Sequence, residues 1–544
     1  MIRCRYATVG ARQVHYRLAG NGPPLVLVHQ SPRSSAEYLP LIEAWSPYFT
    51  VIAPDTPGNG LSDPLPLEDP TIPDYAEALA AFLDAIGVSR AAFYGFHTGA
   101  ATAACMARLF PERVTQAVAN GFAMMGEEER ADFLAHYLPE VTPSWDGAHL
   151  AWAWARIREQ TLFFPWYKAE AGTRMIYDVY GPDNAHEQLM DMLAVGNDYR
   201  APYRAAFAFD KKTVFEGATA PLTIMAAPPD PLYAHLDRLP EPPETITVYR
   251  GRDREDALAK ALEILRAAED GGAEIDTAFR FPDGGGLARR YVDVAGSQIH
   301  LRCGPDRGRR PLVVLHDIGF SGRALAEELA ELAETHTVIA PDLPAHGASG
   351  VTGAGGSLGG TGAALAEALD AVTADGVDIL AFGHSAAVAG DLGDRLGPRV
   401  GRTVLADALL PQGRDDYQER YFPDLTPQAA GGHLLAGWRF VRGRALFWPW
   451  YDERAAAVIP TDRAALEPAR LQEELIAHLQ APPEHRALFT EALAAPPRDT
   501  HDGLRWVLPA WTKGHDGLTQ PEAPRLYEST KPGARMAALK DVLM

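Results

Sequence analysis

Short runs of strand-forming residues alternate with amphipathic segments along the chain. Residues 24 to 29 (PLVLVH) and 50 to 54 (TVIAP) are apolar and end in polar or turn-forming residues. Residues 37 to 49 and 74 to 87 carry apolar residues at helical spacing, with helix breakers at their ends. Apolar strands that alternate with helices are typical of a mainly parallel sheet covered on both faces. The pattern therefore predicts an α/β fold.

The same pattern occurs twice. PLVLVH at residues 24 to 29 matches PLVVLH at 311 to 316, and TVIAPDTPGNGLS from Thr50 matches TVIAPDLPAHGAS from Thr337 at the same separation. A chain of 544 residues is also too long for one hydrophobic core. We therefore predict tandem domains at residues 1–268 and 290–544. The acidic and glycine-rich residues 269–289 are expected to form the linker.

Charge and cysteine usage narrow the classes of function. The net charge of −21 repels nucleic acid and anionic membrane surfaces, so the expected partner is a small molecule. Cys4, Cys105 and Cys303 show neither disulfide nor zinc spacing, and no nucleotide-binding glycine fingerprint occurs, so we expect no metal and no cofactor. The chain has no signal-peptide pattern and no apolar stretch of bilayer length, which favours a cytoplasmic protein. A homo-oligomer is compatible with the sequence.

A strand, a sharp turn and a helix follow in both halves. The turns read Gly-Phe-His-Thr-Gly at residues 95 to 99 and Gly-His-Ser-Ala-Ala at residues 383 to 387. They resemble the nucleophile elbow, G-x-S-x-G, of the α/β-hydrolase family. This resemblance implies two tandem α/β-hydrolase-like domains, each a mainly parallel sheet flanked by helices with a helical cap. The caps are expected at about residues 124–215 and 408–500.

The residue at the nucleophile position departs from the family pattern. The motif places His97 there in the first half, which excludes an ordinary acyl-serine mechanism. Imidazole is a general acid or base near neutral pH, so His97 is our leading catalytic candidate; the alternative is a side chain filling an inactive pocket. In the second half the motif places Ser385 there, and a serine hydroxyl needs an adjacent base to react.

The rest of a triad is incomplete in both halves. The resemblance places Asp230 and Asp516 at the position of the acid. No histidine follows the last strand of the first half, and none occurs after His515 in the second. The second half also ends without an obvious final helix, so we expect it to be degenerate and shortened at its C-terminus.

The expected caps repeat as closely as the cores, from Tyr137 and from Tyr421. His149 and His433 occupy matching positions, and one hypothesis is that they supply the missing base; a structural or helix-capping role is the alternative. Aromatic residues of the caps are expected near a ligand, with ordinary helix packing as the alternative. These candidates are Trp152, Trp166, Tyr167 and Tyr451.

Two backbone amides form the oxyanion hole in the family. The resemblance assigns them to Gln30 and Thr98 in the first half, and to Asp317 and Ala386 in the second. A carboxylate at Asp317 would oppose a developing negative charge.

Two further residues of the first half follow the first strong strand. Ser31 could add a side-chain hydrogen bond to a substrate, whereas His29 could contact substrate or turn its ring into the loop.

Three functions remain open from the sequence. The leading one is an enzyme that acts on a small carbonyl, ester or aromatic-acid substrate, by hydrolysis or acid–base bond cleavage centred on His97. The second is a catalytically inactive tandem protein that binds a ligand or serves as a scaffold. The third is a weak serine esterase that uses Ser385.

Overall fold

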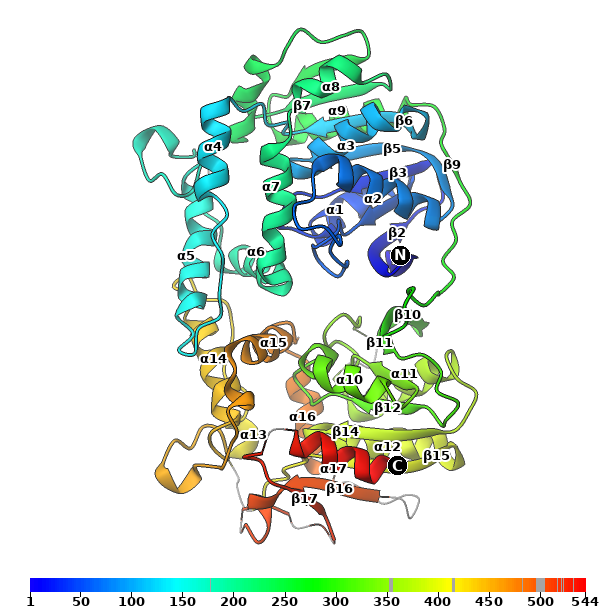
Figure 1. Ribbon diagram of the computed structural model, residues 1–544, viewed down its shortest axis with the longest axis vertical. Coiled ribbons are helices and arrows are strands. Elements are labelled where there is room, and N and C mark those ends of the chain that lie inside the picture. Colours follow the sequence, from blue (N-terminus) through cyan, green and yellow to red (C-terminus); the bar gives the residue numbers. More distant parts are fainter. Residues whose placement is uncertain are drawn as a thin grey trace. The chain divides into compact units, whose positions relative to one another are not determined.

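The chain folds into two compact units in a computed structural model (Figure 1). The structure describes residues 1–176, 178–351, 356–412, 416–481, 483–495, 504–515, 517–519, 521, 523–531 and 533–544. One unit comprises Met1–Thr142 and Trp152–Asp283, and the other comprises Pro143–Ala151 and Gly284–Met544.

The first unit is built on a sheet whose main path runs β1-β2-β4-β3-β5-β6-β7-β8. β1 and β2 are antiparallel to their neighbours, and the pairs from β4 to β8 are parallel. A short strand, β9 (Gly272–Ala273), pairs with β5. The strands of the main path are β1 (Arg3–Val9), β2 (Arg12–Ala19), β3 (Pro24–Val28), β4 (Thr50–Pro54), β5 (Val88–Phe96), β6 (Val114–Asn120), β7 (Leu222–Ala226) and β8 (Ile246–Arg250).

Both faces of this sheet are buried, because apolar side chains of alternating strand residues enter separate cores. Val26 and Val28 pack with α2 (Ile72–Ala85) and α3 (Thr98–Leu109). Leu25 and Leu27 pack on the opposite face with α1 (Leu39–Trp45) and α9 (Arg254–Arg266). These four residues of β3 are each 0% exposed, as expected of a parallel strand covered on both sides.

Five helices lie between β6 and β7, in the part of the chain expected to form the cap. Figure 1 shows α4 to α7 beside the sheet. The helices are α4 (Glu127–His136), α5 (Ala148–Leu162), α6 (Pro182–Val195), α7 (Arg200–Ala208) and α8 (Lys212–Gly217).

The second unit repeats the strand order of the first, as β10-β11-β13-β12-β14-β15-β16-β17. Its strands from β13 to β17 pair in parallel. The two units therefore confirm the predicted tandem α/β fold. The strands are β10 (Ala288–Val294), β11 (Ser297–Cys303), β12 (Leu312–Leu315), β13 (Val338–Pro341), β14 (Val377–Phe382), β15 (Val400–Ala406), β16 (Leu504–Pro509) and β17 (Arg525–Tyr527).

Helices of the second unit cover its sheet and form an insertion between β15 and β16. The covering helices are α10 (Ala326–Ala333), α11 (Leu358–Asp370), α12 (Ala386–Leu396) and α17 (Ala534–Leu543). The inserted helices are α13 (Tyr417–Arg420), α14 (Gly432–Arg444), α15 (Pro468–Leu479) and α16 (His485–Ala494).

Helix α17 corrects one expectation. The second half does have a final helix, and its Met536, Leu539 and Leu543 are buried in the core. These three residues recur at helical spacing, which is the signal in the sequence that predicts this helix.

Among the described residues, no helix is both long and apolar enough to span a bilayer.

Lys211 is a buried ionisable residue between α7 and α8 of the first unit. Lys211 is 6% exposed, and its Nζ donates to the carbonyl of Ala206 at 2.6 Å. Burial, and then the positive charge of Arg130, lower the pKa of Lys211 to about 7. The folded chain therefore favours the neutral amine.

We predict that Lys211→Met stabilises the chain in a pH-dependent way. The folded pKa lies below the unfolded value of about 10.4, so protonation opposes folding fully below pH 7 and less as pH rises toward 10. The gain in unfolding free energy should be about 4 to 5 kcal/mol at pH 6 and small near pH 10. Urea unfolding across this pH range measures it. Lys212→Met is the exposed control, and an equal gain at all pH values would contradict the prediction.

Candidate active site

The turn between β5 and α3 holds His97 in an unusual backbone conformation. His97 has φ 50° and ψ −106°, and its N–H donates to the carbonyl of Asn120 at 2.9 Å. Positive φ is costly for a residue other than glycine and is typical of strained functional turns. The turn also requires Gly99, since a Cβ there would lie 1.9 Å from the carbonyl oxygen of Val28. The elbow expected from the sequence is therefore formed.

The structure brings His97 and Asp230 together. His97 Nε2 lies 2.8 Å from Asp230 Oδ2, and Asp230 Oδ1 accepts from the N–H of Leu232 at 2.8 Å. Burial raises the pKa of Asp230, but the charge and hydrogen bond of His97 outweigh this and hold that pKa below its ordinary value. An ionised Asp230 favours the tautomer of His97 that carries its proton on Nε2.

Two neighbours pack tightly around this pair. The ring of Phe96 stacks on the ring of His97, with 4.0 Å between centroids. Gly121, at φ +72°, lies so close that a Cβ there would be 2.3 Å from His97 Cδ2 and 3.2 Å from Asp230 Oδ2. The geometry of the pair therefore depends on the absence of a side chain at residue 121.

One of the two expected oxyanion-hole amides already has a partner. The N–H of Gln30 donates to Glu37 Oε1, and its side-chain Nε2 donates to Glu37 Oε2, each at 2.9 Å. Thr98 is the first residue of α3, so its N–H has no acceptor within that helix. Sequence reasoning missed Glu37, because nothing in a short 3₁₀ turn marks this residue as a partner of Gln30.

A small cavity of about 180 Å³ lies beside Asp230. It combines polar groups with the aromatic rings of Tyr38, Tyr94 and Phe96. The connection from β8 to α9, where the family carries its histidine, is short, and Arg254 at the start of α9 lines the cavity instead. Its polar lining residues are Gln30, Glu37, Asn120, Asp230 and Arg254.

His29 and Ser31 are both buried in the loop after β3. His29 Nδ1 donates to the carbonyl of Gln30 at 2.8 Å, and its Nε2 accepts from the N–H of Thr56 at 2.9 Å. Both ring nitrogens of His29 are therefore used within the protein, which matches the loop-turned alternative for this residue.

The aromatic candidates of the first cap lie on and after α5. Trp152 is 40% exposed, Trp166 Nε1 donates to the carbonyl of Tyr137 at 3.1 Å, and the Tyr167 hydroxyl donates to Asp132 Oδ2 at 2.7 Å. These three residues are not part of the described lining of the cavity beside Asp230.

The cap histidines play equivalent local roles. His149 Nδ1 accepts from the N–H of Ser144 at 3.0 Å, and His433 Nδ1 accepts from the N–H of Gln428 at 3.1 Å. Each bond closes the loop before a cap helix. This local role is the helix-capping alternative.

The second unit requires a correction at its elbow. Strand pairing matches Val28 with Gly95 in the first unit and Leu315 with Ala381 in the second, so Phe382 corresponds to Phe96 and Gly383 to His97. Gly383 has φ 58°, close to that of His97. The motif comparison was wrong by two residues, because it followed the letters G-x-S rather than the register of the strands.

Ser385 consequently lies at the start of α12 rather than at the tip of the elbow. It is 0% exposed, has φ −68°, and its hydroxyl donates to the carbonyl of His316. The amide that follows the elbow residue is that of His384, not that of Ala386. The N–H of Ala386 already donates to the carbonyls of Gly383 and His384.

Asp317 fills the space that a side chain would occupy at the second elbow. A Cβ on Gly383 would lie 2.4 Å from Asp317 Cγ. Asp317 Oδ1 accepts from the N–H of His384 at 2.8 Å, and Oδ2 accepts from Arg444 at 3.0 Å. The N–H of His384, which could otherwise donate to an oxyanion, therefore already donates to the carboxylate of Asp317. The expectation of an electrostatically poorer second site agrees with this geometry.

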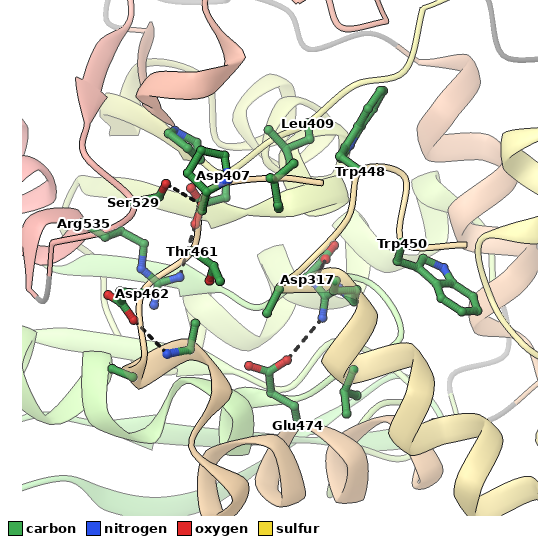
Figure 2. A pocket seen from close by; sticks show the side chains of 18 of the residues that line it. Asp317, Asp407, Leu409, Trp448, Trp450, Thr461, Asp462, Glu474, Ser529 and Arg535 are labelled. Carbon is green, nitrogen blue, oxygen red and sulfur yellow. Dashed lines mark hydrogen bonds and ion pairs between the residues drawn. The ribbon is translucent and has the colours of Figure 1, made fainter. Parts of the chain in front are cut away.

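A larger cavity of about 450 Å³ lies in the second unit. Figure 2 shows Trp448 and Trp450 on one side of it, and Arg535 and Asp462 on the other. Its charges are largely paired with one another; for example, Arg535 contacts Asp407 at 3.2 Å. Tyr451 is absent from its described lining and instead lies under Arg420. Asp516 lies outside the described residues.

The described residues contain no group of three or more His, Cys, Asp or Glu side chains arranged to hold a metal ion.

Comparison with known proteins gives two matches to family models, one in each half. Residues 23–213 match a model described as alpha/beta hydrolase fold, and residues 312–542 match one described as Alpha/beta hydrolase family. A 2-(acetamidomethylene)succinate hydrolase from Mesorhizobium japonicum is 32% identical over 130 residues, which is 24% of this chain and 46% of that enzyme. The match thus spans about half the length of this relative.

Comparison with solved structures gives matches at low sequence identity. The structure of E-2-(acetamidomethylene)succinate hydrolase is 22% identical, with a TM-score of 0.36, and the match covers 48% of this chain and 97% of that one. Epoxide hydrolase A from Mycobacterium thermoresistibile is 20% identical, with a TM-score of 0.39, and the match covers 50% of this chain and 100% of that one.

We predict that Gly121→Ala separates His97 from Asp230, because the new methyl group would overlap the imidazole ring. Loss of the hydrogen bond between His97 and Asp230 should remove, from the proton NMR spectrum, the downfield resonance of an imidazole N–H that is hydrogen-bonded to a carboxylate. Gly196→Ala is the matched control, since Gly196 has φ +56° with nothing within 4 Å of the added Cβ. Both variants place alanine at a positive φ, which is unfavourable for any residue with a Cβ. A resonance that persists in Gly121→Ala would contradict the prediction.

We also predict that a fluorophosphonate probe does not label Ser385, which is fully buried and already hydrogen-bonded. Intact-mass analysis of the treated chain measures this, with Ser385→Ala as the matched control. Labelling of the native chain that disappears in Ser385→Ala would show that this serine is reactive after all.

Proposed function

The chain belongs to the α/β-hydrolase family, as a tandem of two such domains, and we propose that its first domain is an enzyme in which His97 and Asp230 form an acid–base pair. The 2.8 Å contact between His97 Nε2 and Asp230 Oδ2, at the tip of the elbow, is the observation that carries the proposal. A family elbow presents its reactive side chain at this position. The side chain of His97 is 29% exposed, so solvent or a ligand has access to it.

The proposed chemistry uses the other ring nitrogen. No hydrogen bond among the described residues occupies His97 Nδ1, while Asp230 holds the proton on Nε2. Nδ1 can therefore accept a proton from water as the water oxygen attacks a carbonyl carbon. The imidazolium that forms is stabilised by Asp230, and it returns the proton from Nδ1 to the leaving group as the bond to that group breaks. No acyl-enzyme is needed.

The same pair suits bond cleavage without water. Nδ1 would remove a proton from the carbon next to a carbonyl group and would then protonate the leaving group. Both reactions require a single base with a fixed tautomer.

The substrate class that we propose is a small carbonyl compound, ester or aromatic acid. Its support is the cavity beside Asp230, where Tyr94 and Phe96 offer aromatic contacts and Arg254 offers a positive charge to a carboxylate. The described lining of this cavity includes Asp230 and Phe96, which both contact His97, but not His97 itself. The relative from Mesorhizobium japonicum is named for a small substituted succinate, which also carries carboxylates. A carboxylate-bearing ester or amide therefore belongs in the first substrate panel.

A non-catalytic ligand-binding protein is the second candidate. The bond from the Gln30 N–H to Glu37 favours it, because a carboxylate on this amide opposes an oxyanion. In the second domain Asp317 has the same effect on the N–H of His384. Tight binding of a panel compound without turnover would support this function over the first.

We predict that His97→Ala and Asp230→Asn each lower kcat by about 10²- to 10⁴-fold on any panel compound that the native chain turns over, because a general base contributes about this much. The panel should contain p-nitrophenyl esters, N-acyl amides and esters of aromatic acids. His136→Gln is the control, since this α4 side chain is 60% exposed and hydrogen-bonds within its own helix. Unchanged turnover in His97→Ala would exclude the proposed mechanism.

A further inference from the structure

The first hairpin of the chain places a cysteine next to a buried histidine. Cys4 on β1 is partly exposed. In the antiparallel register Cys4 lies opposite Arg17, and Tyr6 lies opposite His15. Residues that face each other share one face of a hairpin, and so do residues two apart on one strand. Cys4 and His15 are therefore diagonal neighbours on the same face.

His15 connects this cysteine to a buried carboxylate. His15 is 0% exposed, its Nδ1 lies 2.8 Å from Asp55 Oδ2, and Cys4 is its diagonal neighbour across the hairpin. Asp55 is held in turn by the N–H groups of Ser35 at 2.7 Å and Leu61 at 2.9 Å. The order of groups is thiol, imidazole and carboxylate, which is the arrangement that activates a nucleophile.

The charges around the thiol favour its ionised form. Burial raises the pKa of Cys4, but the hydrogen bond and charge of His15, together with the charge of Arg17, outweigh this and the opposing charge of Asp55, so the pKa lies below its ordinary value. Burial lowers the pKa of His15, but Asp55 and Cys4 outweigh this and raise it. A thiolate beside an imidazolium is the form that both shifts favour.

The second domain provides an internal comparison. His300 Nδ1 lies 2.9 Å from Asp342 Oδ2, so the histidine–aspartate pair belongs to both copies of the fold. The residue opposite Arg302 there is Arg289, at the position of Cys4. Without a cysteine neighbour, burial dominates and the pKa of His300 is lowered. Both domains therefore share the histidine–aspartate pair, but only the first domain places a cysteine beside it.

We propose that Cys4 is a reactive thiolate, activated by His15 and Asp55, and a site of covalent modification by small electrophiles. The reaction is independent of His97 and Asp230. With an alkyl halide, the sulfur attacks the carbon that carries the halogen, the carbon–halogen bond breaks with its electron pair, and halide leaves. The thiol proton stays on His15.

The other two cysteines serve as controls within the same chain. Cys105 and Cys303 are buried, at 0% and 8% exposure, and burial raises the pKa of each thiol to about 12. Neither should react in the folded chain. A difference between Cys4 and these two therefore reports the local environment rather than the reagent.

The test is alkylation of the folded full-length chain with iodoacetamide, followed residue by residue by mass spectrometry at pH 6 and pH 8.5. An ordinary thiol with a pKa of about 8.5 slows by more than about a hundredfold over this interval. We expect the alkylation rate of Cys4 to fall by less than about thirtyfold from pH 8.5 to pH 6, and we expect Cys4 to react before Cys105 and Cys303. A hundredfold drop at Cys4, or equal rates at the three cysteines in the folded chain, would overturn the proposal.

Two variants separate activation from simple exposure. His15→Asn keeps a donor for Asp55 but removes the second ring nitrogen, so the pH dependence of Cys4 should return to that of an ordinary thiol. His300→Asn makes the same change in the second domain and should leave Cys4 unaltered. Circular dichroism checks that both variants fold. If His15→Asn does not fold, the native chain unfolded in urea supplies the ordinary-thiol reference, and a folded chain with the same pH dependence would refute activation.

Discussion

One buried carboxylate in each domain holds together the loops at the end of its sheet. Asp55 follows β4, is 1% exposed, and collects hydrogen bonds from β2 and from the loops after β3 and β4. Asp342 does the same in the second domain. The nearby positive groups keep the pKa of both carboxyls below the ordinary value, so the charge persists at neutral pH. The carboxylate of Asp55 thus positions the loop that carries Gln30, and that of Asp342 positions the loop that carries Asp317.

With that scaffold shared, the two domains differ in what they place at the elbow. The first carries a histidine that reaches an aspartate across the end of the sheet, and a glycine at residue 121 leaves room for the pair. The second carries a glycine, and a carboxylate from the neighbouring loop fills the vacated space. Asp407, with φ 51°, stands where the first domain has Gly121. The same backbone turn therefore supports a partly buried ionisable pair in one copy and an internal ion-pair network in the other.

The sequence predicts the fold well because the strands of both halves are buried. Buried strands are apolar, so they appear in the sequence as repeated apolar runs. The contact between His97 and Asp230 is also foreseeable, since both residues follow strand ends at the same edge of a parallel sheet. The second elbow was misassigned because a serine between small residues looks like the motif, whereas the strand register decides which residue sits at the tip. Glu37 could not be foreseen, because its bond to Gln30 depends on how a loop folds back.

The carboxylate at the second elbow also restricts how this domain could change. A side chain placed at residue 383 would overlap Asp317. Displacing Asp317 would leave the N–H of His384 without its acceptor and would remove one of the two carboxylates that contact Arg444. Each substitution alone is thus unfavourable, and a reactive residue could return only if positions 317 and 383 changed together. The packing of Asp317 against Gly383 therefore limits which single substitutions the second domain can accept at this turn.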